Sequence, residues 1–148
     1  MIEFTGHLEV EAPPGEVFEL LADMAEVDRW NPNVRNSKRT VGERLEPGSR
    51  YESVIARGPL RMTALPVLVS AEAGRAVRYE GPIGGFWSVD SLTFQPSEKG
   101  THIVFHNQTR TPTWLRPLTP LLKAVFRRQA GRAVEGAGRY LADPAGTW

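Results

Sequence analysis

The amino-acid sequence predicts an α+β domain in which a curved antiparallel sheet of about seven strands wraps a long C-terminal helix. Residues 34–110 contain short apolar and polar stretches separated by Gly- and Pro-rich turns, which is typical of strands. The connections between these strands are too short for a crossover, so neighbouring strands should be antiparallel. Residues 114–142 then carry the periodicity of one long amphipathic helix.

Length and composition predict one globular domain over residues 1–148. Hydrophobic residues make up 41% of the chain and charged residues 24%, both ordinary values for a folded domain. The absence of cysteine excludes a disulfide framework, a thiolate metal site and a cysteine nucleophile. The N-terminus lacks the features of a signal peptide, and no stretch approaches the ~20 apolar residues that span a bilayer. We therefore expect a cytoplasmic protein without a membrane span.

The formal net charge is +1, from 18 basic and 17 acidic residues, so we expect no nucleic-acid partner. Basic residues are nevertheless concentrated in the last third, where only Glu135 opposes them between Thr111 and Ala142. These residues are Arg116, Lys123, Arg127, Arg128, Arg132 and Arg139. We interpret them as the solvated face of a helix; binding to nucleic acid or to an anionic membrane surface is the less favoured alternative.

The N-terminal third predicts one strand followed by two short helices. Residues 2–11 alternate in polarity as a strand does, and the Pro-Pro-Gly sequence that follows ends the strand. Pro14 suits the first turn of a helix, where its missing N–H would have no partner. The second short helix runs from Met24 to about Trp30 and ends before Pro32, because the residue preceding a proline resists the α conformation.

The middle of the chain predicts the rest of the sheet. Gly58-Pro59 and residues 81–85 read as breaks, and residues 98–100 as a tight hairpin. Pro66 interrupts one long strand and must lie at an edge or a bulge. The strands that this reading predicts after residue 50 are Tyr51–Ala56, Leu60–Ala71, Val77–Glu80, Phe86–Gln95 and Thr101–Thr109.

The C-terminal helix is expected to run the length of the sheet. Its regular part should begin near Leu118–Pro120, because Pro117 and Pro120 fit best in or before the first turn. A helix from there to Leu141 is over ~30 Å long, and a sheet curled around it encloses a cavity, an arrangement called a helix-grip fold. The predicted apolar stripe comprises Leu118, Leu122, Val125, Phe126, Gln129, Ala133, Ala137 and Tyr140.

The sequence EVEAPPGEVFELLADMAEVDRWNPNV, Glu9–Val34, resembles the opening of START/Bet v 1-like (SRPBCC) proteins of the polyketide cyclase/dehydrase group. Residues 92–94, the hairpin at residues 100–101 and the terminal helix resemble the later part of that family. The resemblance implies a helix-grip fold with a cavity for a small hydrophobic, polyketide-like or lipid-like molecule. It implies no catalytic residue, because the group shares no catalytic signature. The residues that carry the opening match are Val17, Phe18, Leu21, Asp23, Trp30 and Pro32.

Strand alternation makes Asp90 the candidate catalytic residue. If Leu92 and Phe94 face inward, then Ser88 and Asp90 share that face. An unpaired carboxylate inside an apolar pocket resists ionisation, as a general acid or base requires. Two alternatives stay open: a bulge shifts the register, or Asp90 lies at the rim and pairs with an arginine.

Further inward-facing residues are candidates for ligand contact. Each has a purely structural alternative: the aromatic rings pack in the core, tyrosine hydroxyls reach the rim, and Gln129 caps a backbone group. Trp114 could close the pocket mouth. The predicted ligand-binding set is Trp30, Tyr51, Tyr79, Trp87, Asp90, Phe105, Asn107, Phe126 and Gln129.

Several chemistries are not expected. His102 and His106 are four residues apart on a strand, about 13 Å, which is too far to share a metal ion, and both should face solvent. No Gly-x-Ser-x-Gly sequence occurs, which argues against a serine hydrolase. The glycines at 81, 84 and 85 are followed by no lysine and no helix, so they form no phosphate loop. We expect neither a metal nor a cofactor.

The leading functional hypothesis is therefore binding of a small hydrophobic molecule. One alternative is a polyketide cyclase or aromatase in which Asp90 or a tyrosine carries the proton; it gains support if Asp90 and Gln129 face the same cavity. A second alternative is a protein-interaction domain with a collapsed pocket. Homodimerisation is possible under each of these hypotheses.

Overall fold

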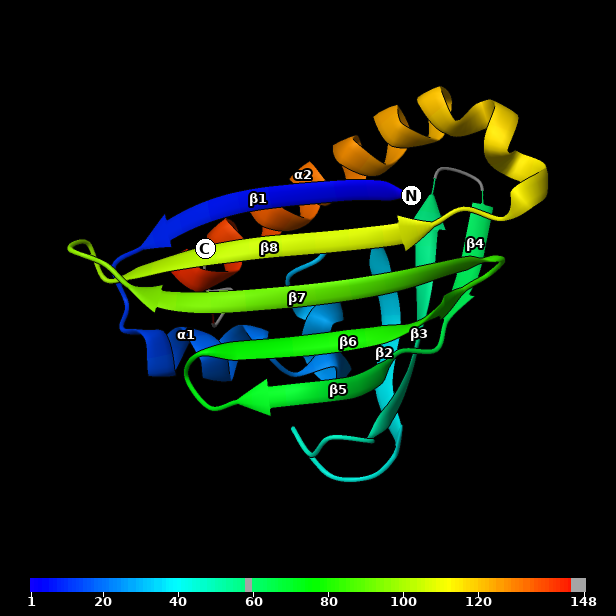
Figure 1. Ribbon diagram of the computed structural model, residues 1–148. Coiled ribbons are helices and arrows are strands. Elements are labelled where there is room, and N and C mark those ends of the chain that lie inside the picture. Colours follow the sequence, from blue (N-terminus) through cyan, green and yellow to red (C-terminus); the bar gives the residue numbers. More distant parts are fainter. Residues whose placement is uncertain (58–59, 145–148) are drawn as a thin grey trace.

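The computed structural model describes residues 1–57 and 60–144 and confirms the predicted helix-grip fold (Figure 1). Gly58 and Pro59, predicted as a break, lie outside the described residues. The strands are β1 (Ile2–Val10), β2 (Val34–Val41), β3 (Arg50–Arg57), β4 (Leu60–Ala64), β5 (Val67–Glu72), β6 (Ala76–Ile83), β7 (Phe86–Pro96) and β8 (Thr101–Arg110). The helices are α1 (Pro14–Leu21), the 3₁₀ helix η1 (Met24–Arg29), the 3₁₀ helix η2 (Thr113–Leu118) and α2 (Thr119–Ala142).

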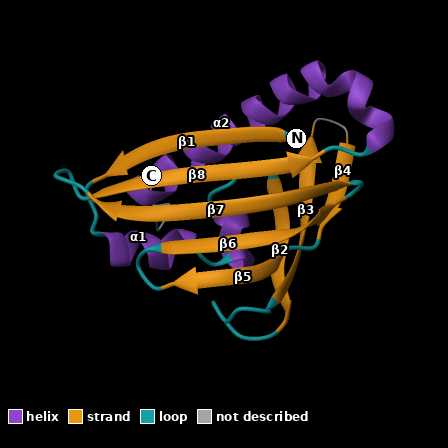
Figure 2. Ribbon diagram, in the orientation of Figure 1, coloured by secondary structure: helices purple, strands orange, loops and turns teal. Residues whose placement is uncertain are grey.

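The strands form one antiparallel sheet in the order β1-β8-β7-β6-β4-β3-β2, and β5 pairs with β3 and β6 beside this path. All the helices lie on one side of the sheet (Figure 2). The first and last strands of the sequence, β1 and β8, are neighbours in the sheet. The strands bend around the helices, so the concave face of the sheet is the one that the helices cover (Figure 1).

The prediction of a single strand at Leu60–Ala71 is wrong, because the chain breaks at Leu65-Pro66 into β4 and β5. Pro66 has no N–H to give to a ladder, but its carbonyl accepts from the Tyr51 N–H at 3.0 Å. The Leu65-Pro66 segment that joins β4 to β5 passes directly over Gly81, where a Cβ would collide with the carbonyl oxygen of Leu65. Gly81 therefore belongs to β6 rather than to the predicted turn, which is confined to Gly84-Gly85.

The two short helices after β1 are confirmed, although the second is a 3₁₀ helix. Asp23 caps it, since its carboxylate accepts a hydrogen bond from the N–H of Ala25 at 3.0 Å. The apolar side of α1 packs into the main core, where Phe18 meets Phe94 edge to face at 5.4 Å between ring centres. These helices close one side of the concave face.

Helix α2 begins at Thr119, as the prolines predict, but only its later turns are buried against the sheet. Phe126 and Ala137 are buried, whereas Leu118 and Val125 of the predicted apolar stripe are exposed. The segment from η2 into the first turns of α2 projects beyond the edge of the sheet (Figure 1), which agrees with the exposure of these two side chains. No helix among the described residues is long and apolar enough to cross a membrane.

Candidate functional site

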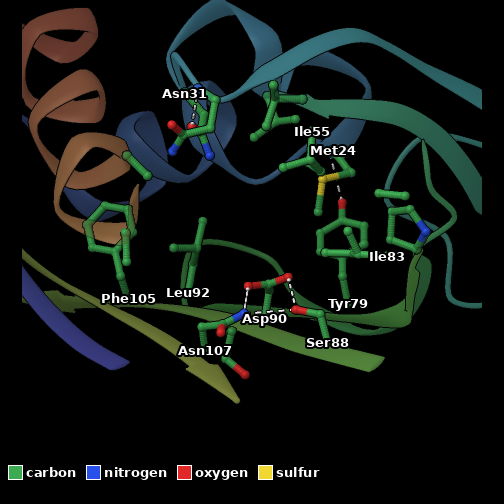
Figure 3. Close-up of a pocket in the computed structure, with 18 of the residues that line it drawn as sticks. Met24, Asn31, Ile55, Tyr79, Ile83, Ser88, Asp90, Leu92, Phe105 and Asn107 are labelled. Atoms are coloured by element: carbon green, nitrogen blue, oxygen red, sulfur yellow. Dashed lines mark hydrogen bonds between the residues drawn. The ribbon is translucent and has the colours of Figure 1, made fainter. Parts of the chain in front are cut away.

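A cavity of about 210 Å³ lies between α2 and the concave face of the sheet (Figure 3). Its walls come from η1, from the inner faces of β6, β7 and β8, and from α2. Engineered cavities of about 150 Å³ admit benzene, whereas drug-sized ligands occupy about 300–1,000 Å³. The cavity in this conformation therefore suits a molecule of one or two rings.

The hairpin of β7 and β8 carries the polar wall of the cavity. Its register is continuous from Trp87 to Pro96, and Asp90 lies directly opposite Asn107. Residues that face each other across an antiparallel pair point to the same side of the sheet. Ser88, two residues before Asp90, and Thr109, two residues after Asn107, join them on the cavity side. This stretch of the hairpin thus contains no bulge that would turn Asp90 away.

Ser88, Asp90 and Asn107 form a closed hydrogen-bond network (Figure 3), and Thr109 extends it through Asn107. The Asn107 amide donates to the Asp90 carboxylate at 2.5 Å and to the Ser88 hydroxyl oxygen at 2.9 Å. The Ser88 hydroxyl donates to the second carboxylate oxygen at 3.2 Å, and the Thr109 hydroxyl donates to the Asn107 carbonyl at 2.8 Å. The network orients the carboxyl group of Asp90 without neutralising it.

Asp90 forms no ion pair with an arginine or a lysine among the described residues, so the alternative of a rim ion pair with an arginine is wrong. Burial raises the pKa of the Asp90 carboxyl above its usual range, and the hydrogen bonds from Asn107 and Ser88 offset only part of that rise. Neither arginine nor lysine lines the cavity among the residues that the structure describes. Asp90 is thus positioned to hold a proton or to exchange one with a bound molecule.

The raised pKa of Asp90 predicts a pH-dependent stability difference between the wild type and Asp90→Asn. Because the folded state binds this proton more tightly than the unfolded chain, wild-type stability falls as pH rises from the unfolded pKa of about 3.9 through the folded value. Urea unfolding across this range should shift in favour of Asp90→Asn by on the order of 1 kcal/mol. Glu98→Gln, at the exposed β7–β8 hairpin, controls for loss of one negative charge, and an equal shift in that variant would contradict the assignment.

Tyr79 lines the cavity, but its hydroxyl has a structural role. It donates to the Ala22 carbonyl at 2.7 Å and accepts from the Met24 N–H at 3.0 Å. Burial raises the pKa of the Tyr79 phenol far above its usual range. Tyr51 packs edge to face against Tyr79, with 5.4 Å between ring centres, and does not line the cavity. Neither tyrosine is placed to carry a proton at neutral pH.

Of the remaining residues predicted to contact a ligand, some line the cavity and one lies outside it. Trp87 is 41% exposed and is not part of the cavity wall. Gln129 lines the cavity from α2, and its backbone carbonyl accepts from the Asn33 amide at 2.8 Å. The structure brings together at the cavity Trp30, Tyr79, Asp90, Phe105, Asn107, Phe126 and Gln129.

Sequence reasoning missed Thr109 and Asn33 as contributors to the site. Thr109 could have been found by extending the alternation two residues past Asn107, whereas Asn33 lies in an irregular loop that has no periodicity to follow. His7 and His102 contact each other, with 3.0 Å between Nδ1 and Nε2. His102 and His106 pair with Glu9 and Glu3 of β1 at 3.2 and 2.7 Å. No group of three or more metal-ligating side chains occurs within the described ranges.

Comparisons with known proteins agree with this architecture. The family model described as polyketide cyclase/dehydrase and lipid transport matches residues 1–142. A protein of Thermus thermophilus superposes with a TM-score of 0.81 at 17% identity, covering 97% of this chain and 99% of its own. The Zhui aromatase/cyclase of Streptomyces sp. R1128 superposes with a TM-score of 0.77 at 14% identity, covering 98% of each chain.

A third solved structure is similar at lower sequence identity. Ara h 8.0201 superposes with a TM-score of 0.66 at 12% identity, covering 95% of this chain and 98% of its own. No curated protein matches the sequence. At these identities the solved structures establish the fold alone.

Proposed function

The chain belongs to the polyketide cyclase/dehydrase and lipid transport family, and on that premise we propose that it binds a small polyketide-like or lipid-like molecule between α2 and the sheet. One observation carries the proposal: the cavity has mostly apolar walls and an oriented, hydrogen-bonded polar cluster around Asp90 and Asn107. Apolar walls supply affinity through burial, and a few fixed polar groups supply orientation.

The size of the cavity limits the ligand. Each buried ring or branched group contributes about 1.5–3 kcal/mol, so three or four such groups reach the ~8 kcal/mol of micromolar binding. A volume of about 210 Å³ accommodates a two-ring molecule or a short branched chain in this conformation. A larger polyketide would require α2 to move away from the sheet.

The charged side chains that line the cavity also limit the charge of the ligand. An anionic group would enter a space whose described lining includes the carboxyl residues Glu80 and Asp90 but neither arginine nor lysine, and whose histidine, His106, already pairs with Glu3 at 2.7 Å. A neutral hydroxyl or carbonyl can instead exchange hydrogen bonds with Asp90 or Asn107 without a buried charge. We therefore propose a neutral, oxygen-bearing apolar ligand.

Two probes that share a naphthalene ring and differ in charge measure this preference directly. At neutral pH, calorimetry should find that neutral naphthol binds at least about tenfold more tightly than anionic naphthoate. Trp87→Ala, which lies outside the cavity, should leave both affinities unchanged. Tighter binding of naphthoate would reject a ligand of this chemical class.

The proposal is tested without a candidate ligand by native mass spectrometry of freshly purified protein, followed by extraction and identification of any bound molecule. Ala133→Phe places a ring in the cavity from α2 and should remove both the adduct and naphthol binding. Ala124→Phe, an exposed position on the same helix, is the matched control and should remove neither. If the wild type carries no adduct and does not bind naphthol, the proposal fails.

A second candidate function is acid–base catalysis of the polyketide cyclase or aromatase type. The observation that favours it is that Asp90 and Gln129 line the same cavity. Asp90 would transfer the proton while the Gln129 amide holds a substrate carbonyl. Turnover that is unchanged in Asp90→Asn on a substrate identified by the extraction would exclude this role. The open cavity counts against the other alternative, an interaction domain with a collapsed pocket.

A further inference from the structure

The segment from η2 into the first turns of α2 exposes a group of large apolar side chains. We call this group the α2 apolar band, and its members are Trp114 (77% exposed), Leu118 (48%), Leu121 (62%) and Val125 (39%). They lie within twelve residues, in η2 and the first turns of α2, a segment that projects past the sheet (Figure 1). A contiguous exposed apolar patch on a small domain marks a surface for interaction, because burying it in a partner is favourable.

Basic side chains continue the same face of the helix. Leu121, Val125, Arg128 and Arg132 follow one another at spacings of four, three and four, which places them in one row along α2. Arg128 and Arg132 are exposed, and neither forms a salt bridge within the described part of the chain. The row therefore passes from apolar to cationic along one helix surface.

The local charge differs from that of the rest of the molecule. Residues 111–134 contain five basic and no acidic side chains, whereas the remainder of the chain contains 13 basic and 17 acidic ones. A second copy of this chain would bring one cationic band against another, which disfavours a symmetric dimer through this surface. A partner that suits the band must combine negative charge with an apolar layer.

We propose that the α2 apolar band and its adjoining arginines dock on the surface of an anionic lipid bilayer. A helix with an apolar face beside basic residues lies in the interfacial plane, with its apolar side chains among the acyl chains and its cations at the headgroups. Exposed Trp114 is suited to that boundary, where tryptophan side chains concentrate. This proposal does not depend on what the cavity binds, although α2 carries both surfaces.

The test is sedimentation of the full chain with vesicles of phosphatidylcholine alone or mixed with phosphatidylglycerol. The wild type should bind only the mixed vesicles and should be released by added salt. Leu121→Ser should weaken binding, and the double variant Arg128→Gln/Arg132→Gln should weaken it about thirty-fold, from two charges near the surface.

Two control variants separate docking from general effects. The exposed pair Lys123 and Arg127 lies on the opposite side of the same helix, so Lys123→Gln/Arg127→Gln should weaken binding less than about fivefold. Val69→Ser removes an exposed apolar side chain from β5 and should have no effect. Circular dichroism should show every variant folded, since all the altered side chains are exposed.

Three outcomes would overturn the proposal. The first is a wild type that does not bind the mixed vesicles. The second is binding that falls equally in the Arg128/Arg132 and Lys123/Arg127 double variants, because binding would then reflect overall charge. The third is a dimer in sedimentation velocity that Leu121→Ser abolishes, since the band would then be an interface between copies of this chain.

Discussion

Gly136→Ala is expected to lower the free energy of unfolding by about 3 kcal/mol and the melting temperature by roughly 10 °C. A Cβ at Gly136 would collide with the carbonyl oxygen of Trp30 and would lie 2.9 Å from Cδ of Pro32. Both obstacles belong to the main chain or to a proline ring, so no side-chain rotation relieves them. Helix α2 would have to move away from the loop after η1, and the cavity wall formed by Trp30 would move with it.

Gly131→Ala is the matched control on the same helix. A Cβ there meets nothing within 4 Å, so the substitution should stabilise the protein by about 0.5–1 kcal/mol through helix propensity alone. Thermal unfolding of the two variants followed by circular dichroism gives the comparison. Equal stability of the two alanine variants would mean that α2 does not pack this closely against the Trp30 loop.

Tyr79→Phe is expected to cost about 2–4 kcal/mol, because it leaves two main-chain groups at the α1–η1 junction without partners. The lost hydroxyl donates to the Ala22 carbonyl and accepts from the Met24 N–H. In the wild type this hydroxyl therefore holds the start of η1 against β6, beneath the cavity. Urea denaturation should show the loss, and amide exchange at Met24 should accelerate.

Tyr51→Phe supplies the control, since the two rings pack against each other in the same core. The buried Tyr51 hydroxyl lies near Tyr79 and the main chain of Leu45 but makes no hydrogen bond of good geometry within the described ranges, so its removal should change stability by less than about 1 kcal/mol. A loss as large as that of Tyr79→Phe would show that the shared ring pair, not the junction, determines the effect.

The inward orientation that the sequence predicts for its polar candidates depends on local periodicity. Asp90 and Asn107 face the cavity because alternation runs unbroken along both strands of one tight hairpin, so no distant contact can alter their direction. The start of α2 follows equally from the prolines near it. Family resemblance and periodicity agreed on the helix-grip fold, which the structure and the family match confirm.

The parts of the fold and of the site that the sequence did not predict depend on contacts between distant segments. The conformation of the break at Pro66 depends on the contact of this segment with Gly81, a residue fifteen positions later in the chain. Exposure of Leu118 and Val125 follows from where the sheet ends, which the helix periodicity does not encode. The hydroxyl of Tyr79 is committed to a helix junction more than fifty residues earlier, so its aromatic character alone suggested a ligand contact.

The central claim is that the space between α2 and the sheet admits an apolar molecule beside Asp90. Amide NMR of the wild type during titration with naphthol tests it most directly. We expect the largest shifts at Asp90, Leu92, Phe105, Gln129 and Ala133, with saturation at micromolar to millimolar concentrations. Shifts confined to outward-facing positions such as Trp87 and Val69, or no shifts at the solubility limit of naphthol, would contradict the claim.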